Sequence, residues 1–178
     1  MHMPLDAPAP TTLVIGCGNP LRGDDAVGIE VVRRLAASDL PAWVRCVDAG
    51  TSGLEVILAM READQVVLID AAATPDDSPS RPGTLHELAP ECLSAANADP
   101  GSGISTHAVR WDQALALARA LAGERLLPAI RCFLIEGNSF GYGEPLSPPV
   151  AAAAERLAGR LAVELCDPGG SRASQGRS

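Results

Sequence analysis

Aromatic residues are scarce in this sequence, and long apolar runs are missing from it. Aromatic residues account for 3% of the 178 positions, whereas apolar residues of all kinds account for 47%. Aliphatic side chains must therefore supply most of the packing, which suits helices that lie closely on a sheet. No apolar run approaches the roughly 20 residues that a membrane-spanning helix needs. The start of the chain also lacks the basic and apolar segments of a signal peptide, so we expect a cytoplasmic protein with no membrane partner.

A basic surface and a paired-cysteine motif are absent as well. The formal net charge is −8, with acidic residues dispersed along the chain. A protein that binds nucleic acid needs lysine and arginine to displace counterions from phosphates, so we expect no nucleic-acid partner. The five cysteines are widely spaced and include no CxxC pair, which argues against a disulfide framework or a zinc knuckle. Cys46 and Cys132 fall within predicted strands, where we expect them to be buried.

Apolar runs and amphipathic segments alternate along the chain. We predict strands over residues 12–18, 44–50, 65–72, 83–89 and 129–137, and helices over about 24–37, 54–63, 107–122 and from Pro148 onward, with Ser147 as N-cap. This alternation predicts an α/β fold in one three-layer domain. Its core is a twisted, mostly parallel five-stranded sheet with one antiparallel edge strand and helices on both faces.

Two segments depart from the alternation. The turn-rich stretch 74–83 has no room for a crossover helix, so the strand over 83–89 is expected to pair antiparallel at an edge of the sheet. Residues 90–105 are rich in Gly, Ser, Asn and Asp, and a loop of that length inside a domain is often functional. The domain is expected to span residues 11–166, with mobile tails at 1–10 and 167–178.

Acidic residues gather at the predicted carboxyl ends of the strands. Ligands of such sheets bind at this edge, where loops lead into helix N-termini. The polar side chains expected there are Asp24, Asp25, Asp48, Asp70, His107 and Glu136, with no lysine and only Arg22 nearby.

Each of these residues also has a structural interpretation. Asp24 suits the N-cap of the helix that follows, and Asp25 suits its first turn, while Asp48 could accept N–H groups of the turn after its strand. Asp70 is harder to explain in this way, because an acid directly after the apolar run VVLI is costly to desolvate without a partner. Asp70 and His107 on one rim, with Asp25 facing them, would form a mixed oxygen and nitrogen site for zinc, nickel or iron, with open coordination positions.

Motifs for nucleotides and for covalent catalysis are missing. In GCGNPLRGDD (16–25) the next glycine after Gly18 is Gly23, so the GxGxxG spacing of dinucleotide-binding proteins is absent. The chain also lacks the GxSxG elbow of serine hydrolases. Cys17 has no histidine close to it in sequence and is a weak candidate for a nucleophile. We therefore expect no nucleotide cofactor and no acyl-enzyme.

Six segments together resemble the hydrogenase maturation endopeptidase family. They are GCGNPLRGDDAVG (16–28), VDAGTSGLEVI (47–57), VVLIDAA (66–72), PGTLHEL (82–88), ISTH (104–107) and IEGNSFGYGEPLSPPV (135–150). Members of this family remove a C-terminal extension from the large subunit of nickel–iron hydrogenase after nickel has been inserted. The resemblance covers about residues 12–165.

The resemblance implies a metal-contacting and catalytic role for Asp25, Asp70 and His107. The nickel would be supplied by the precursor, which is the expected partner of a monomeric protease. Hydrolysis could use a metal-polarised water or a carboxylate that acts as general base, and the roles of Asp48 and Glu136 stay open. The alternatives are a nickel carrier or assembly chaperone with the same ligands, and a peptidyl-tRNA hydrolase-like enzyme, which also begins with a strand and a GxGNP turn but needs a basic surface.

Overall fold

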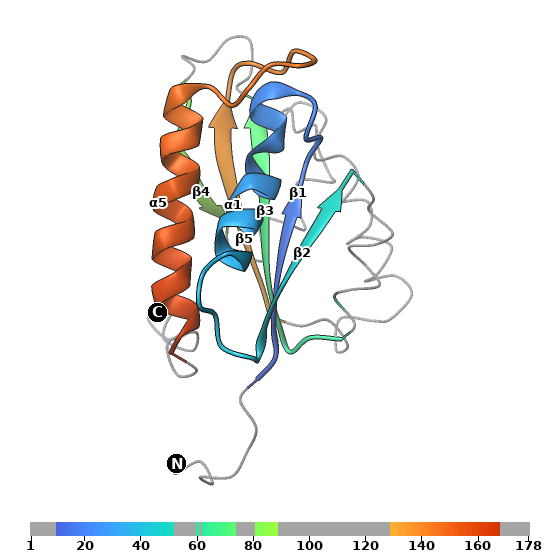
Figure 1. The fold of residues 1–178 in the computed structure, drawn as a ribbon, viewed down its shortest axis with the longest axis vertical. Coiled ribbons are helices and arrows are strands. Elements are labelled where there is room, and N and C mark those ends of the chain that lie inside the picture. Colours follow the sequence, from blue (N-terminus) through green and yellow to red (C-terminus); the bar gives the residue numbers. More distant parts are fainter. Residues whose placement is uncertain (1–9, 52–59, 61, 74–80, 89–128, 168–178) are drawn as a thin grey trace, which may run out of the picture.

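Five strands form one sheet in the computed structural model, which describes residues 10–51, 60, 62–73, 81–88 and 129–167. They are β1 (Thr12–Cys17), β2 (Val44–Gly50), β3 (Gln65–Ala73), β4 (Leu85–Leu88) and β5 (Ala129–Gly137). Their order across the sheet is β2-β1-β3-β5-β4 (Figure 1). The pairs β1–β2, β1–β3 and β3–β5 are parallel, and β4 runs antiparallel to β5. The mostly parallel sheet with one antiparallel edge strand is confirmed.

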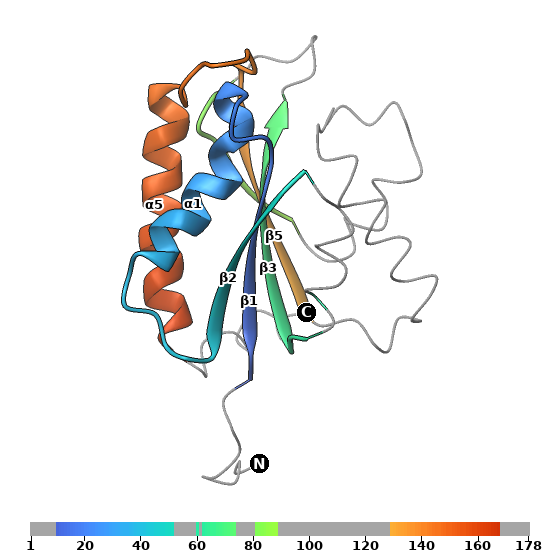
Figure 2. The ribbon, with the colours of Figure 1, turned by 45° about the vertical axis from the view of Figure 1, so that its right-hand side comes forward.

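Two helices lie next to each other on one face of this sheet (Figure 2). Helix α1 (Val27–Ala36) follows a 3-10 turn at Gly23–Ala26, and α5 (Pro148–Leu165) begins at the predicted proline. None of the helices in the described ranges is long and apolar enough to cross a membrane. The predicted helix over 107–122 and the loop over 90–105 lie outside the described residues, as do most of the helix over 54–63 and nearly all of both tails.

Both faces of the sheet are buried, which explains the continuous apolar runs of β1 and β3. Val14 points to the face covered by α1 and α5, where it belongs to a cluster with Val67, Phe133 and Leu157. Its neighbours along the strand point to the other face, which buries Leu13, Ile15, Val66, Leu68 and Met60. A strand buried on both faces needs apolar residues at every position rather than at alternate ones.

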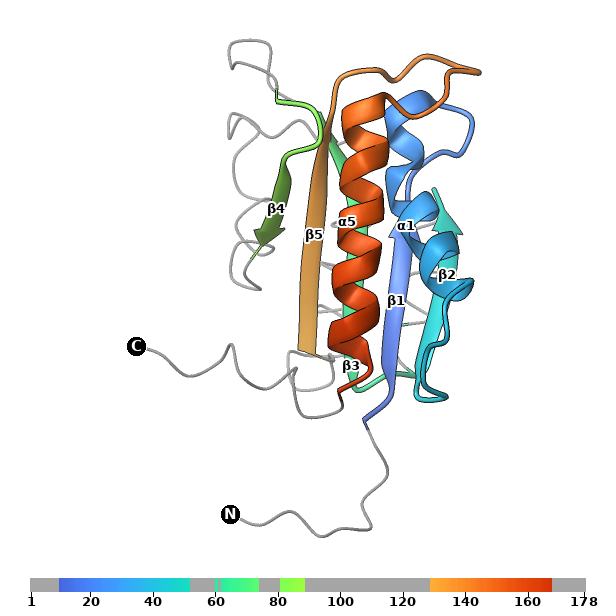
Figure 3. The ribbon, with the colours of Figure 1, turned by 60° about the vertical axis from the view of Figure 1, so that its left-hand side comes forward.

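The edge strand β4 is joined to β5 and to α5 by ion pairs. The carboxylate of Glu87 on β4 lies 2.9 Å from Arg131 on β5 and 2.9 Å from Arg160 on α5. These side chains are partly exposed, so each pair contributes less than about 1 kcal/mol. Figure 3 shows β4 at the end of the sheet, on the far side of β5 from β3. The ion pairs therefore link β4 to β5 and α5 but add little to the stability of the domain.

A close backbone approach fixes where α1 begins. A Cβ atom on Gly28 would collide with the backbone of Ile69 in β3 and stand 2.5 Å from the carbonyl oxygen of Cys17 in β1. The first turn of α1 therefore rests directly on the carboxyl ends of two strands. This contact sets the position of the 3-10 turn that carries Asp24 and Asp25.

Replacing Gly28 by alanine should therefore destabilise the fold, although alanine is the better helix former. We expect the free energy of unfolding to fall by about 1–3 kcal/mol, because backbone atoms of two strands would have to move. Gly159 in α5 is the matched control, since a Cβ atom added there would have no neighbour within 4 Å. Gly159→Ala should raise the free energy of unfolding by up to about 1 kcal/mol. If urea denaturation gave the same change in the free energy of unfolding for both variants, the close contact of Gly28 with β1 and β3 would not be what requires glycine there.

Candidate functional site

The chain changes direction across the sheet at β1. Strand β2 lies on one side of β1 and β3 on the other. In open α/β sheets, ligands bind outside the carboxyl ends of the strands at such a switch point. Gly18 follows the end of β1, and Asp70 lies on β3 one position beyond the last β1–β3 pair, which joins Gly16 and Ile69. The candidate site is therefore the edge formed by these two strand ends.

Asp25 and Asp70 both lie next to Gly18, Asp25 through its backbone carbonyl and Asp70 through its side chain. Gly18 has a φ of +123°, and a Cβ atom there would collide with the carbonyl oxygen of Asp25 and stand 3.7 Å from Oδ1 of Asp70. Only glycine fits this position. Both acids are buried, with exposed fractions of 7% for Asp25 and 3% for Asp70. The structure thus places the two predicted site carboxylates at the switch point.

Each of the two carboxylates accepts a backbone hydrogen bond. Oδ2 of Asp25 accepts the N–H of Asn19 at 3.0 Å, and Oδ1 of Asp70 accepts the N–H of Ala71 at 2.8 Å. His107 lies outside the described residues. Within the described ranges, no group of three histidine, cysteine or acidic side chains is arranged to hold a metal ion. The three-residue ligand set remains a prediction.

Asp24 does not cap a helix, which corrects the expectation from the sequence. It lies inside the 3-10 turn, the α-helix begins only after it, and its side chain is fully buried. Its carboxylate accepts the N–H groups of Asn138 and Ser139 at 3.0 Å each and that of Ser147 at 2.7 Å. The 3-10 turn points this side chain at the loop after β5 and away from the N-terminus of α1. Asp24 is thus the anchor of that loop.

Ser147 stands where an N-cap was predicted, but its side chain has another partner. Its backbone is extended just before α5, and no side-chain cap bond forms. The hydroxyl instead donates to Oδ2 of Asp24 at 3.0 Å. A carboxylate is a strong hydrogen-bond acceptor, and this bond makes the hydroxyl part of the Asp24 anchor.

Two other predicted rim acids have local structural roles. Oδ1 of Asp48 accepts the N–H of Gly50 at 3.1 Å, as the turn interpretation expects, and its Oδ2 pairs with Arg33 at 3.2 Å. Oε1 of Glu136 accepts the N–H of Arg81 at 2.9 Å, which ties the segment before β4 to β5. These contacts account for both residues without a ligand.

Cys17 lies at this edge as a neutral thiol. Burial is the main cause that raises its pKa well above the ordinary value, and the charge of Asp70 raises it further. Burial also raises the pKa of Cys132. Cys132 is buried as predicted, whereas Cys46 is only half-buried because it lies on the edge strand β2. A thiol that stays protonated is a poor nucleophile.

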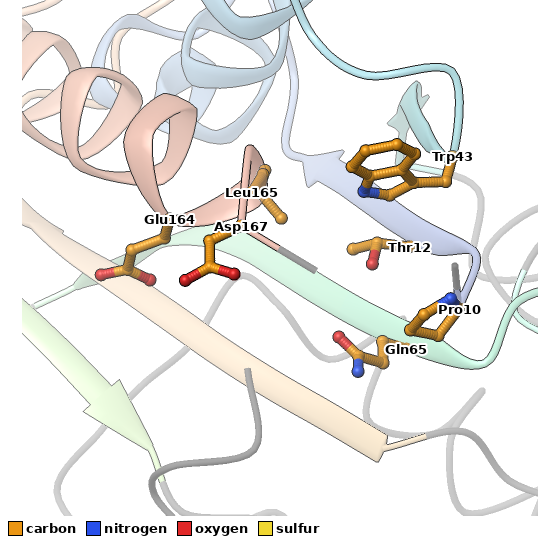
Figure 4. A pocket seen from close by; sticks show the side chains of 7 residues that line it. All are labelled: Pro10, Thr12, Trp43, Gln65, Glu164, Leu165 and Asp167. Carbon is orange, nitrogen blue, oxygen red and sulfur yellow. The ribbon is translucent and has the colours of Figure 1, made fainter. Parts of the chain in front are cut away.

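A small pocket lies at the opposite end of the sheet, near the starts of β1 and β3 (Figure 4). It is lined by Pro10, Thr12, Trp43, Gln65, Glu164, Leu165 and Asp167. Glu164 is already paired with Arg131 at 3.0 Å and Arg160 at 2.6 Å. Because the pocket lies at the starts of these strands, it is remote from the acids at their carboxyl ends.

Comparisons with known proteins agree on one family. A family model described as hydrogenase maturation protease (HycI) matches residues 29–164. Hydrogenase expression/formation protein HupD of Rhodobacter capsulatus is 31% identical over 141 residues, which cover 78% of this chain and 63% of the relative. Hydrogenase 2 maturation protease of Escherichia coli is 35% identical over 80 residues, 44% of this chain and 47% of the relative. The chain thus spans between about half and two thirds of the length of these curated relatives.

A solved structure extends the likeness to most of the fold. The hydrogenase maturating endopeptidase HybD of E. coli superimposes with a TM-score of 0.72 and 25% sequence identity. The superposition covers 89% of this chain and 94% of HybD.

The raised pKa and the burial of Cys17 predict that its thiol reacts slowly with alkylating reagents. Iodoacetamide at neutral pH should leave Cys17 unlabelled in the folded protein, because only the thiolate reacts and the residue is buried. Cys166, which is exposed, is the internal control and should be labelled under the same conditions. Peptide mass mapping after denaturation should then show both thiols reacting. Labelling of Cys17 in the folded protein as fast as that of Cys166 would contradict the neutral buried thiol.

The hydrogen bonds of the Asp24 anchor predict a large loss of stability when one carboxylate oxygen is replaced by an NH2 group. Asp24→Asn should lower the free energy of unfolding by roughly 2–3 kcal/mol, because the new NH2 group faces buried donors. Asp39→Asn, at an exposed position after α1, is the matched control and should leave stability within about 0.5 kcal/mol. Chemical denaturation monitored by circular dichroism measures both. Equal stability of the two variants would show that the anchor is dispensable.

Proposed function

The chain belongs to the hydrogenase maturation protease family, and from this membership we propose that it removes the C-terminal extension of a nickel–iron hydrogenase large-subunit precursor after nickel insertion. The observation that supports this most directly is that Asp25 and Asp70 are both buried beside Gly18, at the switch point of the sheet. Two carboxylates at the switch point of the sheet would supply oxygen ligands for a divalent metal. We further propose a monomeric, cytoplasmic enzyme that needs no nucleotide.

In this proposal the nickel belongs to the substrate. Asp25 and Asp70 would contact the nickel that the precursor already holds, and His107 would add an imidazole nitrogen. The Nε of Arg22, the basic residue expected near these acids, donates to the carbonyl of Phe140 at 3.2 Å. Because the protein has only to complete an existing coordination sphere, binding depends on nickel being present. Precursor without nickel would then stay uncut.

Peptide hydrolysis requires an activated water and a proton for the leaving amine. Either the nickel of the precursor polarises the water, or a rim carboxylate removes its proton as general base. The same carboxylate can then return the proton to the nitrogen of the cleaved bond. The neutral thiol of Cys17 favours these routes over a covalent thioester intermediate.

The proposal predicts that processing requires both carboxylates. Asp25→Asn and Asp70→Asn should each lower the processing rate at least about 100-fold, because an amide is a weak metal ligand and no base. Asp39→Asn, at an exposed position, is the matched control and should process normally. Mass spectrometry of nickel-loaded precursor measures the loss of the extension, and circular dichroism checks that each variant is folded. A folded Asp70→Asn variant with full activity would refute the assignment.

The same assay separates a protease from a carrier and tests the role of nickel. Wild-type protein should shorten the nickel-loaded precursor and leave the metal-free precursor intact. Binding or transfer of nickel without cleavage would instead identify a nickel carrier or assembly chaperone. Equal cleavage of both precursors would overturn the nickel requirement while leaving the peptidase activity in place.

A further inference from the structure

Two loops that are far apart in the sequence form one surface at the carboxyl edge of the sheet. Residues 19–22 connect β1 to the 3-10 turn, and residues 138–144 follow β5. We call these two segments together the loop platform. Figures 1 and 3 show the two connections close together at the same end of the molecule. The N–H of Gly143 donates to the carbonyl of Leu21 at 2.8 Å, so the segments are in direct contact.

The loop platform exposes two large hydrophobic side chains. Leu21 is 63% exposed and Tyr142 is 74% exposed. Among the described residues, the one other large hydrophobic residue that is exposed to this degree is Val163 on α5. Exposed hydrophobic side chains that gather at one place commonly mark a contact surface, and tyrosine is enriched at protein interfaces.

Contacts of Arg22 and Asp24 hold the loop platform in place. The guanidinium of Arg22 lies 5.4 Å from the centre of the Tyr142 ring, and its Nε is bonded to the carbonyl of Phe140. The N–H of Asp24 donates to the carbonyl of Ser139 at 2.7 Å, next to the bonds that the buried Asp24 carboxylate accepts. Side chains that are already positioned lose less conformational entropy when a partner binds. This favours a preformed docking surface over a flexible loop tip.

Asn19 links the loop platform to the candidate site. Its N–H donates to the Asp25 carboxylate at 3.0 Å, and its side-chain oxygen accepts the N–H of Leu21 at 3.0 Å. Asn19 thus connects Leu21 directly to the Asp25 carboxylate, which the proposed function places on the nickel. A protein substrate that brings its nickel to Asp25 must also lay surface beside Leu21.

We propose that Leu21 and Tyr142 form a docking surface for the body of the hydrogenase large-subunit precursor, beside the segment that is cut. The partner surface that fits is apolar, because it has to cover an aliphatic side chain and an aromatic ring. This inference rests on the proposed function and adds to it the surface that recognises the protein part of the substrate. Recognition then has two components, the nickel at the carboxylates and the apolar contact on the loop platform.

The test compares binding and processing of nickel-loaded precursor by a Leu21→Ala/Tyr142→Ala variant. We expect Kd and KM to rise on the order of 10- to 100-fold, since exposed interface anchors of this kind carry much of the binding energy. The change should fall on KM and spare kcat, because the lost contacts are equally strong before and during the reaction. Val163→Ala removes the third exposed hydrophobic side chain, away from the site, and should leave Kd within about twofold of wild type.

The outcomes separate this inference from the proposed function. If the wild-type protein processes the precursor and the double variant has unchanged Kd and KM, the docking surface is wrong and the protease stands. If the wild-type protein binds but does not cut, the protease is wrong, and the Kd of the double variant still decides the docking surface. Absence of any wild-type binding overturns the docking surface. The single variants Leu21→Ala and Tyr142→Ala should each show part of the rise in Kd, which keeps the test valid if the double variant unfolds.

Discussion

The buried carboxylate of Asp24 joins three parts of the molecule that carry the candidate site. A buried charge is strongly destabilising unless hydrogen bonds replace the water it has lost. Here the N–H groups of Asn138, Ser139 and Ser147 and the hydroxyl of Ser147 supply those bonds. Because these donors follow β5 and precede α5, the one carboxylate ties the start of α1 to both elements. The position of the carboxyl edge depends on this contact.

Adjacent aspartates in this arrangement have different roles. The 3-10 turn directs the side chain of Asp24 into the loop after β5, while the Asp25 carboxylate meets the N–H of Asn19 beside Gly18. One acid therefore builds the scaffold that positions the other. Sites that perform chemistry need such support, because a carboxylate that is free to move would not hold a metal or a water at a defined place. The close approach of Gly28 to β1 and β3 adds the second restraint.

The Asp24 anchor also links the candidate site to the loop platform. Asp24 fixes the loop that carries Tyr142, and Asn19 bonds both to Asp25 and to Leu21. In the proposed mode of recognition, a substrate that touches the loop platform would be brought to the two carboxylates in one orientation. For the proposed protease, contact at two neighbouring places would give greater selectivity than the metal alone.

The sequence by itself determined the strands and the site edge. The apolar runs predicted the bounds of β2 and β5 without error, and the short turn before β4 predicted its antiparallel pairing. The sequence also predicted that Asp25 and Asp70 lie at the same edge of the sheet, because the carboxyl ends of parallel strands share one edge. Only the tertiary structure decided the role of Asp24, the partner of the Ser147 hydroxyl and the contact of Leu21 with Gly143. The bonds to Asp24 join residues 114 to 123 positions apart, and a side chain whose partners lie that far along the chain leaves no local pattern.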